Sequence, residues 1–119
     1  MNKTKKLREL FNSNRLIRVM GAHNALGAKL VEKSGFDAAW ASGLEISTSC
    51  ALPDANILTM TDFLNAASSM NEAVNIPIVA DCDTGFGNSN NVIHLVGKYE
   101  AAGIAAVCIE DKLFPKVNS

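Results

Sequence analysis

Two aspartates and a glycine-rich turn form the stretch of this sequence best suited to chemistry. The stretch reads Asp81-Cys82-Asp83-Thr84-Gly85-Phe86-Gly87-Asn88 and follows a short apolar run, residues 76–80, that predicts a buried strand. A buried carboxylate is unfavourable unless it has a partner, so Asp81 and Asp83 each need a cation, hydrogen-bond donors or water. Because the available ligands are oxygens, the stretch predicts a hard-cation site, with Mg²⁺ as the first candidate.

A third carboxylate follows the next predicted strand. Residues 104–109 are apolar and lead directly into Glu110. Adjacent parallel strands end at one edge of a sheet, where ligands bind in α/β proteins, so Glu110 can share an ion with Asp81 and Asp83. Other interpretations stay open at this point. An Asp-x-Asp pair after a strand is a weak signal by itself, and Asp54, which follows a proline, also fits an Asx turn.

Alternating strands and amphipathic helices should position these carboxylates. The predicted strands cover residues 16–20, 36–41, 76–80 and 104–109, and the predicted helices cover residues 4–11, 24–34, 59–74 and 91–102. Asn24 suits a helix N-cap, as do Thr59 or Thr61 for the following helix, and Gly35 suits a helix stop. Residues 45–56 show no periodicity, so we expect an irregular loop there.

The apolar spacing of each helix predicts which side chains face the core. In the helix after Asn24, we expect an inward stripe of Leu26, Leu30 and Val31. The stripes expected in the two later helices are Phe63, Ala66 or Ala67, Met70, Ala73 and Val74, and then Val92, Leu95, Val96 and Tyr99.

A weak internal repeat indicates the fold class. Residues 32–40 and 100–108 both contain a helix end, a glycine, one apolar residue and a strand of small residues. Repeated strand–helix units predict parallel strands joined by right-handed crossovers. We therefore expect an α/β fold, the N-terminal half of a (β/α)8 TIM-type barrel with about four parallel strands, as one partial domain over residues 1–119. A whole barrel takes about 200 to 250 residues, so the C-terminal half is expected outside this chain. A small flavodoxin-like sheet is the alternative.

The composition is that of an ordinary globular protein, with 48% hydrophobic residues, 19% charged residues and a net charge of -1. Basic residues gather near the start without interleaved aromatic residues, so we expect no nucleic-acid partner. We expect no membrane span or signal peptide, and a cytoplasmic location. The three cysteines lack CxxC spacing and predict neither disulfides nor a zinc site. Cys108 is expected in the core, and Cys82 on the strand face opposite Asp81.

Four segments together resemble the phosphoenolpyruvate mutase branch of the isocitrate lyase/phosphoenolpyruvate mutase superfamily. They are Trp40-Ala41-Ser42-Gly43-Leu44, Pro53-Asp54, the stretch from Asp81 to Asn88, and the stretch from Glu110 to Ser119. The resemblance covers nearly the whole chain. The last segment is the most specific, because the lyases carry a K-[KR]-C-G-H motif where this chain has Phe114-Pro115-Lys116-Val117-Asn118-Ser119. The phosphonopyruvate hydrolases are similar there, with Thr in place of Asn118.

The resemblance implies the interconversion of phosphoenolpyruvate and 3-phosphonopyruvate, a step of phosphonate biosynthesis in which a P–C bond forms by phosphoryl transfer within one molecule. By resemblance, Asp83 is the direct Mg²⁺ ligand, and Asp81 and Glu110 hold the ion through its waters. This suits Mg²⁺, which retains several waters and takes few direct carboxylates. The ion would stabilise the pyruvate enolate.

The resemblance also implies the residues that bind the substrate. The Ser42 hydroxyl and the N–H groups of Gly43 and Leu44 would bind its carboxylate, and Trp40 would lie against the pyruvate plane, although a tryptophan also fits a core. Asp54 would lie near the migrating phosphoryl group, as a nucleophile or as an orienting charge.

The final residues would form a gating loop that closes over the substrate. Lys116 and Asn118 belong to this loop by resemblance, with Asn118 donating to the phosphoryl oxygens and Ser119 among the substrate-binding residues. A closed loop would keep water from the phosphoryl group, whose transfer depends mainly on positioning and neutralisation.

The resemblance also limits what this chain should do alone. The phosphoryl-binding Arg and His of the family come from strands beyond the fourth, so we expect little or no turnover from residues 1–119, and a homo-oligomer, the family's tetramer, for a full-length protein. The alternatives are a phosphonopyruvate hydrolase, another carbon–carbon lyase of the superfamily, and a non-catalytic remnant that acts as a subunit.

Overall fold

The computed structural model describes residues 2–117, in nine helices and strands. In chain order these are α1 (Lys3–Phe11), β1 (Val19–Ala22), α2 (Ala25–Lys33), β2 (Ala38–Ala41), α3 (Gly43–Ser49), α4 (Met60–Ala73), β3 (Ile78–Asp81), α5 (Ser89–Ala101) and β4 (Ala106–Cys108). The predicted strands are confirmed, with ends displaced by up to three residues. Among residues 2–117, no helix is long and apolar enough to cross a membrane.

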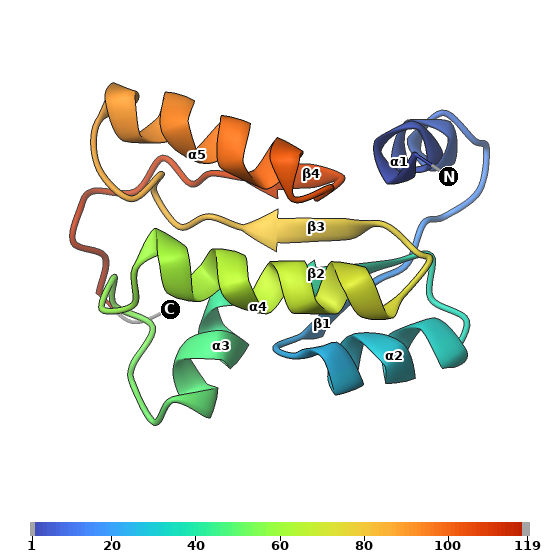
Figure 1. The fold of residues 1–119 in the computed structure, drawn as a ribbon, viewed down its shortest axis with the longest axis horizontal. Helices are drawn as coiled ribbons and strands as arrows, with labels where there is room; N and C mark the ends of the chain where they lie inside the picture. The colour runs from blue at the N-terminus through green and yellow to red at the C-terminus, as the bar shows by residue number, and fades with distance from the viewer. Residues whose placement is uncertain (1, 118–119) are drawn as a thin grey trace.

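The four strands form one parallel sheet in the order β1-β2-β3-β4. Each strand is joined to its neighbour through a helical segment, which is the connectivity of successive barrel strands. The β3 arrow in Figure 1 points toward α3 and the final segment, residues 109–117, which follows β4. Helix α1 lies at the opposite end of the sheet. All four strands therefore deliver their carboxyl ends, and the loops that follow, to one edge.

The main core lies between one face of the sheet and helices α2, α4 and α5. Small strand residues, such as Ala39, Ala41 and Ala80, are almost fully buried and let the helices approach closely. The predicted α4 stripe is confirmed, because Phe63, Ala67, Met70 and Val74 are all buried. Side chains alternate along a strand, so the face opposite this core carries Trp40, Val79, Asp81 and Cys108, with Asp81 directly paired in register to Cys108.

Local sequence signals explain where the helices begin and end. The Asn24 side chain caps α2, Thr59 forms a capping box with Asp62 at α4, and Asn88 caps α5. Gly35 follows α2 with a φ of 80°, a left-handed conformation that glycine adopts without steric conflict.

Four sequence predictions are wrong, three about buried side chains and one about an irregular loop. In α5, Val96 is 44% exposed, because this helix faces the core through Leu95 and Tyr99. In α2, Val31 is buried as predicted, but Leu26 and Leu30 are 69% and 57% exposed, because the helix faces the core through Ala28 and Val31. Cys108 is exposed because it lies at the carboxyl end of β4 on the face opposite the main core, whereas α1 packs through Leu7 near the other end of that face, against Ala38 and Ala106. Residues 45–56 are not wholly irregular: Gly43–Ser49 form α3, whose Ser42 N-cap accepts the Glu45 N–H.

Candidate active site

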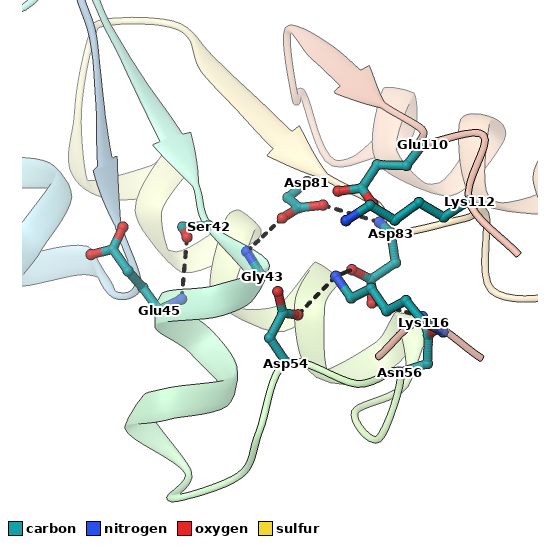
Figure 2. A network of polar contacts seen from close by, with 10 residues as sticks. All are labelled: Ser42, Gly43, Glu45, Asp54, Asn56, Asp81, Asp83, Glu110, Lys112 and Lys116. Carbon is teal, nitrogen blue, oxygen red and sulfur yellow. Dashed lines mark hydrogen bonds and ion pairs between the residues drawn. The ribbon is translucent and has the colours of Figure 1, made fainter. Parts of the chain in front are cut away.

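Five charged side chains gather at the carboxyl ends of β3 and β4. Figure 2 shows Asp54, Asp81, Asp83, Glu110 and Lys116 converging from four segments of the chain. Asp54, Asp83 and Lys116 are 3%, 1% and 4% exposed. So many buried charges require partners, and the contacts below supply them.

Asp81, the last residue of β3, is held by main-chain donors. Its Oδ2 accepts the Gly43 N–H at 2.9 Å, and its Oδ1 accepts the Asp83 N–H at 3.1 Å. Burial raises the pKa of the Asp81 carboxyl, and the nearby Asp83 adds to this, against the lowering effect of the two N–H donors. In residues 2–117, no side chain donates a hydrogen bond to Asp81, so its remaining lone pairs are available to a cation or water.

Lys116 connects the two other aspartates of the cluster. Its Nζ lies 2.6 Å from Oδ1 of Asp83 and 2.8 Å from Oδ1 of Asp54. Burial alone would lower the Lys116 pKa, but the hydrogen bonds to Asp54 and Asp83 outweigh it, so the pKa is raised and the group remains an ammonium. Lys116 thus brings the final segment onto the carboxylates, as Figure 2 shows.

Asn56 is a part of the site that the sequence analysis missed. Its Oδ1 accepts the Lys116 main-chain N–H at 2.6 Å, and its Nδ2 donates to Oδ2 of Asp83 at 3.3 Å. The residue has a φ of 60°, a left-handed conformation that Asn tolerates better than most residues. The only signal in the sequence was its position two residues after Pro53-Asp54, within a turn.

Glu110 joins the cluster through its main chain. The Glu110 N–H donates to the Asp83 carbonyl at 2.7 Å, which fixes the segment after β4 against the turn after β3. Its side chain is 30% exposed and pairs with Lys112 at 3.2 Å. The three carboxylates predicted to share an ion are therefore brought to one region, although Asp83 is engaged by Lys116.

The predicted carboxylate-binding residues lie beside Asp81, at the start of α3. Gly43 is packed so closely that an added Cβ would lie 2.7 Å from Oδ2 of Asp81 and 3.1 Å from the Phe63 ring. Its N–H group is already donated to Asp81. Ser42 is buried, Leu44 is 47% exposed and Trp40 is half-buried. Asn118 and Ser119 lie outside the described residues, and the predictions about them stay predictions.

The donor set fits a divalent cation by charge and by ligand type. The site contains four carboxylates, of Asp54, Asp81, Asp83 and Glu110, and two ammonium groups, of Lys112 and Lys116. The formal charge of the site is therefore -2. All the oxygens are hard carboxylate ligands of the kind that Mg²⁺ prefers. Within residues 2–117, no three Asp, Glu, His or Cys side chains lie close enough together to hold a metal ion directly. An ion that keeps most of its waters suits such an arrangement.

Cys82 lies in the main core, on the side of β3 opposite Asp81, as predicted. It is fully buried, and burial raises the pKa of its thiol to about 12. A thiol that stays protonated is a poor nucleophile, so the chemistry of this site rests on the carboxylates and Lys116.

Comparisons with known proteins agree with this arrangement. The family model described as phosphoenolpyruvate phosphomutase matches residues 7–119. A phosphonopyruvate hydrolase of Variovorax sp. (strain Pal2) is 50% identical over 119 residues, which cover 100% of this chain and 41% of the hydrolase.

Two solved structures are similarly close. The crystal structure of a phosphoenolpyruvate phosphomutase from Streptomyces platensis subsp. rosaceus is 63% identical with a TM-score of 0.94, covering 97% of this chain and 40% of that one. A phosphonopyruvate hydrolase in complex with oxalate and Mg²⁺ is 50% identical with a TM-score of 0.94, covering 98% of this chain and 41% of that one.

This chain therefore spans about two fifths of the length of these relatives. Its four parallel strands are the N-terminal half of a TIM-type barrel, which confirms the predicted fold class. The family match over residues 7–119 includes the acidic cluster, which consists of Asp54, Asp81, Asp83, Glu110 and Lys116. The match shows that the chain belongs to the phosphoenolpyruvate phosphomutase family of enzymes.

Proposed function

We propose that this chain supplies the metal-binding and pyruvate-binding half of a phosphoenolpyruvate phosphomutase site. The observation that carries the proposal is the buried cluster of Asp54, Asp81, Asp83 and Lys116 at the carboxyl edge of the sheet. A relative with the same fold is solved with Mg²⁺ and oxalate, a two-carbon dicarboxylate that mimics the pyruvate enolate. The reaction would interconvert phosphoenolpyruvate and 3-phosphonopyruvate.

Mg²⁺ is the proposed cofactor, held by Asp81, Asp83 and Glu110. We assign the direct ligand to Asp81 and place Asp83 with Glu110 on the ion's waters, which exchanges the roles that the family resemblance implied. The reason is that both Asp83 oxygens already accept hydrogen bonds, from Lys116 and Asn56, whereas those of Asp81 accept only main-chain N–H groups. A bound Mg²⁺ would supply stabilisation of enolate charge.

The protein's own groups would bind and orient the substrate. Gly43 donates its N–H to Asp81, and it lies between Ser42 and Leu44 at the start of α3, where the pyruvate moiety would meet the metal. Trp40 lies on the neighbouring strand β2, in register with Val79. Lys116 holds the Asp54 carboxylate and keeps its charge balanced next to the proposed path of the phosphoryl group. In this arrangement Asp54 acts as an orienting group, and a role as nucleophile would require Lys116 to release it.

Phosphonopyruvate hydrolysis is the second candidate, because a hydrolase is 50% identical over the whole chain. The lyase alternative has less support, since residues 114–119 contain no cysteine. Cytoplasmic location and homo-oligomeric assembly stay predictions.

Binding and turnover test separate parts of the proposal. Titration of the chain with Mg²⁺ and oxalate in a calorimeter should show metal-dependent binding, which Asp81→Asn abolishes and the exposed Asp111→Asn preserves. Lack of binding by the unsubstituted chain would overturn the proposal and favour a non-catalytic remnant.

For turnover, the chain can be joined to the remaining barrel of the 63% identical Streptomyces platensis phosphomutase. With 3-phosphonopyruvate as substrate, a mutase yields phosphoenolpyruvate, whereas a hydrolase yields pyruvate and phosphate. Phosphorus NMR distinguishes the two outcomes in one experiment.

A further inference from the structure

Asn56, in the loop between α3 and α4, contacts two different segments of the chain through the oxygen and the nitrogen of its side-chain amide. The Oδ1 atom accepts the main-chain N–H of Lys116 at 2.6 Å, and the Nδ2 atom donates to Oδ2 of Asp83 at 3.3 Å. These partners lie 60 and 27 residues away in the sequence. A single planar group thus connects the final segment to the turn after β3.

The consequence for Lys116 is that it is fixed at both ends. Its ammonium is bound by Asp83 and Asp54, while its main chain is bound by Asn56, two residues after Asp54. The ion pairs fix the distance between the ammonium and the carboxylates, but a long lysine side chain leaves the path of its backbone free. The Asn56 contact removes that freedom.

We propose that Asn56 is a positioning residue that ties the Lys116 segment to the Asp83 carboxylate and so sets the geometry of the acidic cluster. This inference rests on the proposed function for its catalytic meaning, although the tie itself is a property of the chain without metal or substrate. Asn56 would touch neither reacting atoms nor Mg²⁺, and it would act through Asp83 and Lys116.

The chemistry of the position explains the residue type. One partner is a donor and the other an acceptor, so the side chain must offer both, as an amide does. An aspartate would keep the acceptor for the Lys116 N–H but would place a second carboxylate against Asp83. The φ of 60° further disfavours most residues other than Asn, Asp and Gly.

Two variants and one control separate these contributions. Asn56→Gly removes the amide without opposing the left-handed backbone, and Asn56→Asp keeps only the acceptor. Ala51→Gly is the matched control, because Ala51 has a φ of 57° in the same connection and its side chain is not part of the cluster.

Hydrogen exchange of the metal-free chain is the first measurement. In Asn56→Gly, the Lys116 amide should exchange about tenfold faster, the effect of losing one hydrogen bond, while amides of α4 and β3 stay unchanged. The Lys116 exchange rate in Asn56→Asp should lie between the rates in Asn56→Gly and in the unsubstituted chain. Ala51→Gly should leave the Lys116 amide protected. If the Lys116 exchange rate is unchanged in Asn56→Gly, or if exchange rates rise equally throughout the chain, Asn56 does not hold the Lys116 segment in place.

Affinity for Mg²⁺ with oxalate is the second measurement. Asn56→Gly should bind about tenfold more weakly than the unsubstituted chain and the Ala51→Gly control, because Asp83 and Lys116 are no longer held together. Equal affinities, with Lys116 exchanging faster, would overturn the positioning role. Absence of binding by the unsubstituted chain would instead contradict the proposed function, and the exchange result would still decide whether the tie exists.

Discussion

The main-chain N–H of Gly43 donates to Oδ2 of Asp81 at 2.9 Å, across 38 residues of sequence. This bond connects the start of α3, where the substrate carboxylate is proposed to bind, with the end of β3, where the metal is proposed to bind. Because the Asp81 carboxylate and the Phe63 ring lie so close to Gly43, a side chain at position 43 would collide with them. The two halves of the proposed pyruvate site are therefore built as one unit.

Gly43→Ala should damage this unit. The new Cβ would lie 2.7 Å from Oδ2 of Asp81, so either the carboxylate or α3 must move. We expect a loss of about 1–3 kcal/mol of folding stability, typical of overpacking, and weaker binding of Mg²⁺ with oxalate. Urea denaturation and calorimetry measure the two effects. Gly97→Ala is the control, because a Cβ there meets nothing within 4 Å, and it should stabilise the helix by about 0.5–1 kcal/mol.

Lys116→Met should destabilise the chain strongly. Removal of the ammonium leaves Asp54 and Asp83 buried without their shared cation, and breaking a buried ion pair costs about 3–5 kcal/mol. Chemical denaturation of this variant and of the exposed Lys98→Met control gives the difference. A loss no larger than that of Lys98→Met would show that the ion pairs contribute little.

As the pH falls, Mg²⁺ binding should be lost at a pH above 3.8, the ordinary pKa of an aspartate. Burial raises the Asp81 pKa in the folded chain, so this carboxylate becomes protonated at a higher pH than an exposed one and then cannot bind metal. Calorimetric titrations over a pH series locate the midpoint. A midpoint below 3.8 would argue against Asp81 as the direct ligand.

The stabilising effect of Asp37 should disappear in acid. Hydrogen bonds from the Arg15 side chain and the Arg18 N–H lower the Asp37 pKa below its ordinary value of 3.8. A carboxyl with a lowered folded-state pKa contributes stability above its unfolded value, and this is lost as the pH falls through the folded value. Asp37→Asn should therefore be less stable than the unsubstituted chain at neutral pH and converge with it below 3.8. Thermal melts at several pH values test this, with Asp111→Asn as the control.

The features that repeat along the chain could be predicted from sequence. The 3.6-residue spacing of Phe63, Ala67 and Met70 placed the buried face of α4 correctly. The position of Asp81 and Glu110 after apolar runs put both at the carboxyl edge of a parallel sheet. These predictions succeeded because burial and strand direction follow directly from local pattern and connectivity.

Contacts between distant segments could not be predicted in the same way. Val31 was predicted correctly on the inward face of α2, but close packing against α4 buried the small Ala28 and left Leu26 and Leu30 exposed. The two contacts of Asn56 depend on partners 60 and 27 residues away, which no periodicity reveals. The helix α3 was missed because seven residues rich in Ser and Thr carry little helical signal.

The uneven burial of the three cysteines makes the proposed site accessible to spectroscopy. Cys108 is exposed and lies beside Asp81 in the strand register, whereas Cys82 is fully buried on the opposite face. After Cys50→Ser, a thiol-reactive fluorophore should label a single position, because a buried protonated thiol reacts slowly. Such a reporter beside Asp81 would register metal and oxalate arriving at the sheet edge through a change in emission, without any need for turnover.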